Sequence, residues 1–242
     1  MVSERHNQAY KESIKQFAAM SPDAPLRPFA AHELISTNAL HFPECGRDSP
    51  PVNLIHISAE ALVRLDESEA VIAESEQWAH AAGGWTSKRH FNHPTTDIPL
   101  AELPATREWF NDWCLREGYP FLAASFGEAL PNPRALRVAD AFVVKYNASG
   151  GQTSLSTHRD GSVLSFNIAL NERCEYEGGG TWFAGIDRAF AIEKGHVLAH
   201  MSGMLHGGHP ITSGTRYILV SFVVIQGYQN YAMRLMKSVW DH

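Results

Sequence analysis

The chain has 242 residues, of which 44% are hydrophobic and 19% are charged, and its formal net charge is −6. This length and composition fit one sizeable enzyme domain, and the acidic balance excludes a global basic field of the kind that attracts nucleic acid. An odd number of cysteines without a C-x-x-C pair argues against a disulfide framework or a structural zinc site; they are Cys45, Cys114 and Cys174.

The first part of the chain is predicted to be helical and then extended. Residues 1–20 carry a weak helical pattern, and repeated prolines interrupt regular structure between residues 21 and 51. The amino terminus has no apolar signal-peptide core, and the longest apolar run is too short to cross a bilayer. We therefore expect a cytoplasmic protein without a membrane partner.

A strand and two helices are predicted next. The run V-N-L-I-H-I is typical of a short strand, and Ser58 is the expected N-cap of a helix that begins A-E-A-L-V-R-L and ends before Gly83-Gly84. A second helix is expected from Ala105 to Cys114, resuming from Pro120 to Phe126. These helices precede a marked change in the pattern of the sequence.

The second half of the chain is predicted to be β structure. From Arg137 onward, short β-rich runs alternate with turns; they are A-F-V-V-K-Y, L-S-F-N-I-A-L, G-T-W-F, F-A-I, H-V-L-A-H and R-Y-I-L-V-S-F-V-V-I. Such spacing indicates a mainly β fold with flanking α-helices, built on a double-stranded β-helix core of the jelly-roll, cupin-like type. We expect one structural domain, with a helical and extended region at 1–135, the core at 136–228 and a C-terminal helix at 229–242.

Four polar residues of the last third form the strongest candidate site. His158 and Asp160 stand two apart in S-T-H-R-D-G-S, so in a strand both side chains point the same way and can meet one metal ion. His206 follows 46 residues after Asp160, and Arg216 lies ten residues further on an apolar strand. Two His and one carboxylate with open positions form the facial triad of non-haem Fe(II) oxygenases, and a buried Arg suits a carboxylate-bearing co-substrate.

An isolated H-x-D motif also has simpler explanations. In a chain with thirteen His, His158 could be a surface strand residue or the partner of Asp160 in a hydrogen bond. Gly161, the β-rich run after it and the distal His206 favour the metal site instead, because this spacing leaves room for the intervening strands of a jelly roll.

The ordered motifs resemble a known family. Together V-V-K-Y, H-R-D-G, N-I-A-L-N, Y-E-G-G-G-T-W-F, L-H-G-G and P-I-T-S-G-T-R-Y-I-L-V-S-F look like the catalytic domain of iron- and 2-oxoglutarate-dependent prolyl and lysyl hydroxylases, with the lysyl hydroxylases the more similar. The resemblance covers residues 137–224. It implies that His158, Asp160 and His206 hold Fe(II).

The resemblance also implies a set of co-substrate contacts. Arg216 would pair with the distal carboxylate of 2-oxoglutarate, and Tyr146 would hydrogen-bond the co-substrate, although a core Tyr is the alternative. Asn167 could face the co-substrate or satisfy a neighbouring backbone group, because a buried amide must find partners.

The activity implied by the resemblance is hydroxylation of an unactivated C–H bond, with release of succinate and CO2. The cofactors would be Fe(II), 2-oxoglutarate and O2, with ascorbate as the reductant. The substrate would be an amino acid, a lysyl or prolyl residue of a peptide, or an amino-acid-derived metabolite. The alternatives are desaturation or oxidative cyclisation by the same chemistry, and a non-catalytic metal-binding jelly-roll module. Asp160 disfavours halogenation, because halogenases of this superfamily lack this carboxylate.

Further candidates lie outside the four-residue set. Asp97 would meet a substrate ammonium group, Lys88 or Arg89 would meet a substrate carboxylate, and His93 lies in the same loop. His196 and His200 are about 13 Å apart if they lie on one strand, so they cannot share an ion and are expected to have packed or hydrogen-bonded roles.

Overall fold

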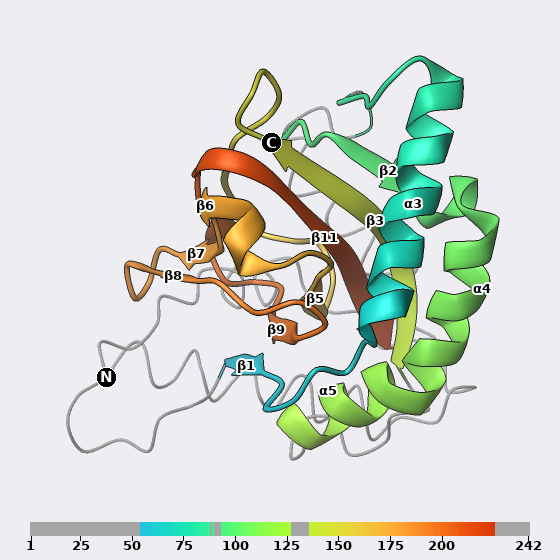
Figure 1. Cartoon of the computed structure of the whole chain (residues 1–242). Coiled ribbons are helices and arrows are strands. Elements are labelled where there is room, and N and C mark those ends of the chain that lie inside the picture. Colours follow the sequence, from blue (N-terminus) through green and yellow to red (C-terminus); the bar gives the residue numbers. More distant parts are fainter. Residues whose placement is uncertain (1–53, 88, 90–92, 127–135, 226–242) are drawn as a thin grey trace.

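The structure, a computed structural model, describes residues 54–87, 89, 93–126 and 136–225 (Figure 1). Several sequence predictions lie outside these residues: the helical pattern of residues 1–20, the extended segment of residues 21–51, the C-terminal helix of residues 229–242 and the side chain of Lys88. Within the described residues, no helix is long and apolar enough to span a bilayer.

Two antiparallel sheets form the core. The large sheet has the order β1, β9, β5, β11, β3, β2, with β6 paired to β11, and the small sheet has the order β4, β10, β7, β8. The large-sheet strands are β1 (Ile55–Ile57), β2 (Asp97–Pro99), β3 (Leu136–Asn147), β5 (Leu164–Ala169), β6 (Tyr176–Gly178), β9 (Val197–Met201) and β11 (Ile211–Ile225). The small-sheet strands are β4 (Leu155–His158), β7 (Thr181–Phe183), β8 (Arg188–Phe190) and β10 (His206–Gly208). The mainly β, jelly-roll prediction is confirmed.

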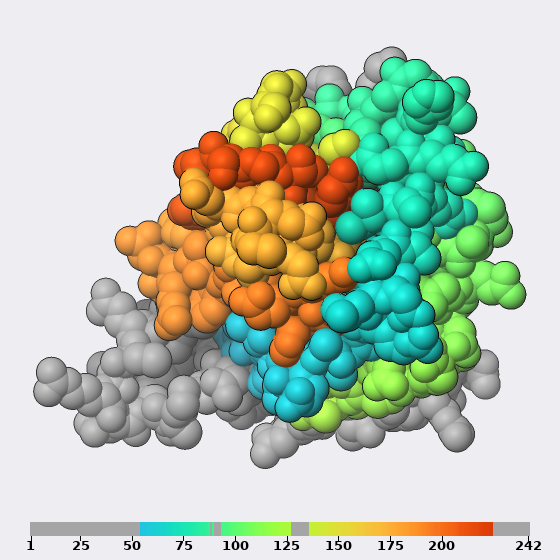
Figure 2. All heavy atoms as spheres, in the orientation of Figure 1, coloured from blue at the N-terminus to red at the C-terminus, as the bar shows by residue number. Residues whose placement is uncertain are grey.

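The helices lie together along the large sheet, beside β3 and β11 (Figure 1). They are α3 (Leu65–Ala82), the short 3₁₀ helix η1 (Leu100–Glu102), α4 (Pro104–Trp113) and α5 (Tyr119–Ser125), with a π-helical turn from Cys114 to Gly118 between the last two. In the space-filling view, α3 runs along the surface in direct contact with the strand residues (Figure 2). The predicted interruption between Cys114 and Pro120 is therefore a π-helical turn within one helical stretch.

Aromatic rings join the helices to the large sheet. Phe110 and Trp113 of α4 stack with ring centroids 5.8 Å apart, and both contact Phe166 of β5, at 6.2 and 5.8 Å. All six residues of β5 are buried, because the helices cover one face of the strand and the small sheet covers the other. This two-sided burial explains why the strand has an apolar run rather than a strict alternation.

The start of the first described helix differs from the prediction. Ser58 is not an N-cap, because its backbone N–H donates to Val197 O at 2.9 Å and its Oγ accepts from Val197 N–H at 3.0 Å. These bonds continue the pairing of β1 with β9, and the helix begins only at Leu65. The predicted end is correct: Gly83 follows the helix with a φ of 87°, a left-handed conformation that favours glycine.

The short strands were the least predictable elements. The predicted run F-A-I is a strand only at its first residue, because β8 ends at Phe190. The strand expected to carry both His158 and Asp160 is β4, but it ends at His158 and Asp160 lies beyond it. Three strands had not been predicted: β2, β6 and β10. Each has three residues, which is too few for an alternating pattern to show.

Asn171 links the end of β5 to β11. Its Nδ2 donates to Thr215 O at 2.8 Å, and its Oδ1 accepts from Tyr217 N–H at 2.8 Å, in a side chain that is buried. Asn171→Ala is expected to lower the free energy of unfolding by about 1–3 kcal/mol, because it takes the side-chain partners from two half-buried backbone groups. Urea denaturation measures this, with Asn111→Ala on the exposed side of α4 as the control. Equal effects of the two substitutions would contradict this role.

Glu76 of α3 holds the helix to the sheet through three donors: Lys145 Nζ at 2.7 Å, Tyr217 OH at 2.6 Å and Trp85 Nε1 at 3.1 Å. Burial raises the pKa of Glu76, but these hydrogen bonds outweigh it and hold the pKa below its ordinary value of 4.5. The stabilisation is therefore present above pH 4.5 and is lost as the pH falls through the lower folded-state pKa.

We expect Glu76→Gln to remove this part of the acid destabilisation, an effect of about 1 kcal/mol or less because the carboxylate is partly exposed. Unfolding free energies measured at several pH values would show a shallower acid limb for the variant than for the wild type. The exposed Glu102→Gln is the control, and an acid limb unchanged by Glu76→Gln would disprove the assignment.

Candidate metal centre

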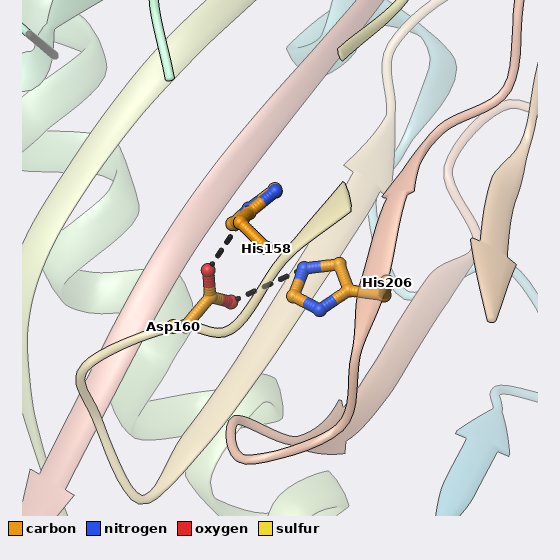
Figure 3. A group of neighbouring side chains, drawn as sticks. All are labelled: His158, Asp160 and His206. Atoms are coloured by element: carbon orange, nitrogen blue, oxygen red, sulfur yellow. Dashed lines mark ion pairs between the residues drawn. The ribbon is translucent and has the colours of Figure 1, made fainter. Parts of the chain in front are cut away.

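Two neighbouring strands of the small sheet bring the predicted ligands together. His158 is the last residue of β4 and His206 is the first of β10, and the two are direct partners in the antiparallel register. Asp160 lies in the turn after β4, where its backbone N–H donates to Ser202 O at 3.0 Å. Figure 3 shows the carboxylate between the two imidazoles.

The geometry of the cluster is that of a metal site. Asp160 Oδ1 lies 3.2 Å from His158 Nε2, and Asp160 Oδ2 lies 3.4 Å from His206 Nε2. One ligand atom from each residue can be chosen so that all lie within 4.8 Å of one another. The structure thus brings together the three residues that the sequence predicted.

Backbone carbonyls orient both imidazoles. His158 Nδ1 lies 2.8 Å from Ser156 O, and His206 Nδ1 lies 2.9 Å from Met204 O. A carbonyl can only accept, so Nδ1 carries the proton in each ring. Each Nε2 is then the nitrogen on the side of Asp160 that could coordinate a metal ion once any proton on it is displaced, which is the arrangement that metal-binding histidines adopt.

The protonation states also favour a cation. Burial raises the pKa of Asp160, but His206 and His158 outweigh it and hold the pKa well below its ordinary value. Burial lowers the pKa of His206, although Asp160 opposes this. Burial lowers the pKa of His158, but its hydrogen bond with Asp160 and the charge of that carboxylate outweigh burial and raise it. The buried carboxylate anion therefore has a positive partner in His158, and a metal cation could take the place of that proton.

Four imidazoles form a row through the centre. His93 lies 5.0 Å from His158 between ring centroids, His158 lies 4.5 Å from His206, and His206 lies 4.3 Å from His200. His200 is fully buried, and burial lowers its pKa to about 3, so this ring is neutral. Its Nδ1 lies 3.0 Å from Met201 O, and its ring packs against His206.

The predicted packed or hydrogen-bonded roles of His196 and His200 are confirmed. His196 Nδ1 lies 3.0 Å from Ser58 O at the edge of the large sheet. The sequence did not reveal that His200 contacts a candidate ligand, because this contact comes from the packing of β9 against β10 across the two sheets. The sequence signal for this contact is that His200 stands in an apolar run six residues before His206.

Arg216 lies on the large sheet between the two layers. Its side chain is 3% exposed, its Nη1 approaches Gly180 O at 3.4 Å, and its buried Nε has no hydrogen-bond partner. Within the described part of the chain, no carboxylate forms an ion pair with it. A buried guanidinium with an unused donor is suited to an anionic ligand.

Tyr146 of β3 stands beside Arg216 of β11. The two are register partners, and the guanidinium carbon lies 5.3 Å from the centre of the phenol ring. Burial raises the pKa of Tyr146, so the phenol keeps its proton and can donate it in a hydrogen bond. A Cβ on Gly208 would lie 2.6 Å from Tyr146 OH, and one on Gly179 would lie 3.2 Å from Arg216 Cδ, so glycines keep the space around both side chains open.

Asn167 has a partner within the protein. Its Nδ2 donates to Thr181 Oγ1 at 2.9 Å, which joins β5 of the large sheet to β7 of the small sheet. This contact accounts for a buried amide in an apolar strand. A contact between Asn167 and the co-substrate stays a prediction.

The predicted substrate residues fall into two groups. His93 lies beside the centre, with its Nδ1 3.0 Å from Ser156 Oγ. Arg89 instead pairs with Asp97, with Nε 3.4 Å from Oδ2, and with Asp140, with Nη2 2.6 Å from Oδ2. Arg89 and Asp97, which the sequence predicted to contact substrate groups of opposite charge, thus form an ion pair with each other.

Comparisons with known proteins show which enzymes this chain is similar to. No family model matches the chain. The human multifunctional procollagen lysine hydroxylase and glycosyltransferase LH3 is 33% identical over 168 residues, which cover 64% of this chain and 22% of that protein. Human procollagen-lysine,2-oxoglutarate 5-dioxygenase 1 is 39% identical over 137 residues, which cover 54% of this chain and 18% of that protein. The chain therefore spans about a fifth of the length of these relatives.

Solved structures show the same fold. A collagen prolyl hydroxylase from Paramecium bursaria Chlorella virus 1 has a TM-score of 0.51 at 14% identity, over 70% of this chain and 95% of that one. A prolyl-4-hydroxylase from Pseudomonas putida has a TM-score of 0.50 at 15% identity, over 72% and 94%. The similarity to the lysyl hydroxylases, together with this shared fold, supports a 2-oxoglutarate- and Fe(II)-dependent oxygenase domain. That domain is prolyl and lysyl hydroxylase-like.

Arg216→Met tests whether the buried guanidinium destabilises the protein when no anionic ligand is bound. In the absence of ligand, the variant is expected to have a free energy of unfolding about 1 kcal/mol or more above that of the wild type, because an unpaired buried charge is costly. Urea denaturation of the metal-free protein measures this, with the exposed Arg107→Met on α4 as the control. A loss of stability specific to Arg216→Met would show that Arg216 already has a structural partner.

Proposed function

We propose that the protein is an Fe(II)- and 2-oxoglutarate-dependent dioxygenase that hydroxylates an unactivated C–H bond and releases succinate and CO2. The observation that carries this proposal is the set of His158, Asp160 and His206, whose ligand atoms lie within 4.8 Å of one another. The same jelly roll holds a buried Arg216, with which no carboxylate among the described residues forms an ion pair. The sequence similarity to lysyl hydroxylases supports it.

His158, Asp160 and His206 would hold Fe(II). Two neutral nitrogen donors and one carboxylate are the donor set of the facial triad, which leaves coordination positions for the co-substrate and oxygen. When bound, the iron with 2-oxoglutarate and O2 supplies the oxidising chemistry, and the protein supplies binding, orientation and a dry site.

The co-substrate would be held from the large sheet. Arg216 offers two parallel N–H groups to the distal carboxylate of 2-oxoglutarate, and the protonated Tyr146 donates a further hydrogen bond. Apolar residues around them exclude water and strengthen both contacts; they are Phe142, Val144, Tyr176, Ile211 and Ile218. The guanidinium is thus desolvated before the co-substrate arrives, so binding needs little reorganisation.

The proposed substrate is an amino acid, an amino-acid-derived metabolite or a lysyl or prolyl residue of a peptide. The names of the relatives, which refer to procollagen lysine and to collagen prolyl hydroxylation, favour the peptidyl substrate. His93 is the proposed substrate contact, because it lies next to His158. Asp97 could meet a substrate ammonium group only by exchanging its contact with Arg89, and a substrate KM that is unchanged in Asp97→Asn would remove Asp97 from the proposal.

A second outcome of the same chemistry is desaturation or oxidative cyclisation. The α-ketoglutarate-dependent epimerase SnoN from nogalamycin biosynthesis shares the fold, with a TM-score of 0.50 at 14% identity over 71% of this chain and 78% of that one. A fold of this type therefore hosts more than hydroxylation.

Product mass separates the outcomes, since hydroxylation adds an oxygen atom and desaturation or cyclisation removes two hydrogens. A non-catalytic module would release no succinate. We further propose ascorbate as the reductant and the cytoplasm as the location.

Succinate release by the purified protein tests the proposal. With Fe(II), ascorbate and 2-oxoglutarate under air, the wild type is expected to form succinate. His158→Ala is expected to lower the rate at least about 100-fold, because loss of a ligand should cost more than the roughly 10–100-fold effect of losing a residue that only orients one. Amino acids and short lysyl or prolyl peptides are screened for the one that raises the rate.

The exposed His80→Ala on α3 is the matched control and is expected to keep the wild-type rate. Metal-dependent binding of 2-oxoglutarate is measured in parallel by calorimetry. Neither succinate release nor metal-dependent binding in the wild type would leave only a binding module.

A further inference from the structure

Three serine hydroxyls form a chain beside the candidate metal centre: those of the buried Ser165 and Ser202 and of the half-buried Ser162. Ser202 Oγ lies 2.7 Å from Ser162 Oγ and 2.8 Å from Ser165 Oγ. We propose that this chain, with Ser202 at its middle, positions Asp160 relative to His206 and so sets the affinity of the site for its metal. The inference rests on the metal centre of the proposed function.

The hydroxyl protons have one consistent order. Ser162 Oγ donates to Leu164 O at 3.1 Å, and because a hydroxyl has a single proton, it must accept from Ser202. Ser202 has then used its own proton and must accept from Ser165. The chain runs from Ser165 through Ser202 and Ser162 to Leu164 O, so Ser202 is the one member that both accepts and donates within the group.

The chain joins the turn that carries Asp160 to the turn that leads into His206. Ser165 belongs to β5 and Ser162 to the turn that follows Asp160, whereas Ser202 lies in the turn between β9 and β10. Backbone bonds run in parallel with the hydroxyl chain. Asp160 N–H donates to Ser202 O at 3.0 Å, and Ser202 N–H donates to Val163 O at 3.2 Å. Ser202 is thus bonded through its N–H, its carbonyl and its hydroxyl to the segment that holds Asp160.

The same turn also determines where His206 lies. His206 Nδ1 is fixed at 2.9 Å from Met204 O, two residues after Ser202. Arg159 adds a contact from its Nη1 to Gly203 O. A shift of the Ser202 turn against the Asp160 turn therefore changes the separation of the carboxylate from the imidazole of His206, which is 3.4 Å from Asp160 Oδ2 to Nε2.

A metal ion requires this separation to be held within about 0.5 Å. Ser202 is fully buried and Ser165 nearly so, and neither can exchange its partner for bulk water without opening the core. Ser202→Ala would remove the middle of the chain and leave only the 3.3 Å approach of Ser162 to Ser165. The two turns would then be joined by fewer bonds, and the ligands would be held less tightly.

The affinity of the metal-free protein for Co(II) tests this positioning role. Ser202→Ala is expected to weaken Co(II) binding about tenfold, at the lower end of the effect of residues that orient metal ligands. Ser165→Ala removes only the first donor, keeps the bond between Ser202 and Ser162, and is expected to weaken binding less than threefold. The exposed Ser149→Ala is the control and should bind Co(II) as the wild type does.

A second readout separates positioning from mere support of the fold. The visible absorption of bound Co(II) reports ligand geometry, and its bands are expected to shift in Ser202→Ala but not in Ser149→Ala. A variant that melts at a lower temperature without metal, yet binds Co(II) with wild-type affinity and spectrum, would overturn the inference. If Ser202→Ala does not fold, the half-buried Ser162→Ala breaks the same chain, and wild-type Co(II) affinity in that variant would overturn the inference as well.

The outcome also distinguishes the two proposals. A wild-type protein that binds no Co(II) would overturn the metal centre itself, and the inference with it. A wild-type protein that binds Co(II), with Ser202→Ala unchanged in affinity and spectrum, would overturn the role of the serine chain and leave the oxygenase proposal intact.

Discussion

The pairing of β4 with β10 is the constraint on which the metal centre depends. Because His158 ends one strand and His206 begins its register partner, backbone hydrogen bonds fix the two imidazoles side by side. A slip of one residue would turn one ring to the opposite face of the sheet. Asp160 lies just past the end of β4, where the chain has left the ladder and its carboxylate can turn between the rings (Figure 3).

Each of the two sheets contributes a different set of side chains to the candidate site. The small sheet carries the two histidines of the candidate metal centre, and the large sheet carries Arg216 and Tyr146. The buried charges are therefore opposite in sign and lie on separate layers: a carboxylate on one side and a guanidinium with an unused donor on the other. A metal cation and a dicarboxylate would complement both, since each buried charge needs a partner to offset its desolvation.

The helices contribute rigidity rather than chemistry. The contact of Phe110 and Trp113 with Phe166 fixes β5, and Asn167 on the same strand reaches across to Thr181 of the small sheet. The alternation of side chains along β5 thus joins the helical layer to the small sheet, which carries the candidate metal centre. A site that must keep its ligands in place benefits from this continuous packing.

By itself, the sequence determined the fold class and identified the three candidate ligands that the structure brings together. The spacing of His158 and Asp160, the distal His206 and the long apolar strand with Arg216 are local patterns, so they could be read without coordinates. The true start of the helix at Leu65, the ion pair of Arg89 with Asp97, the contact of His200 with His206 and the serine chain were decided only by the tertiary structure. Each of these joins segments distant in sequence or depends on competition between local and long-range hydrogen bonds, and no local pattern records which partner prevails.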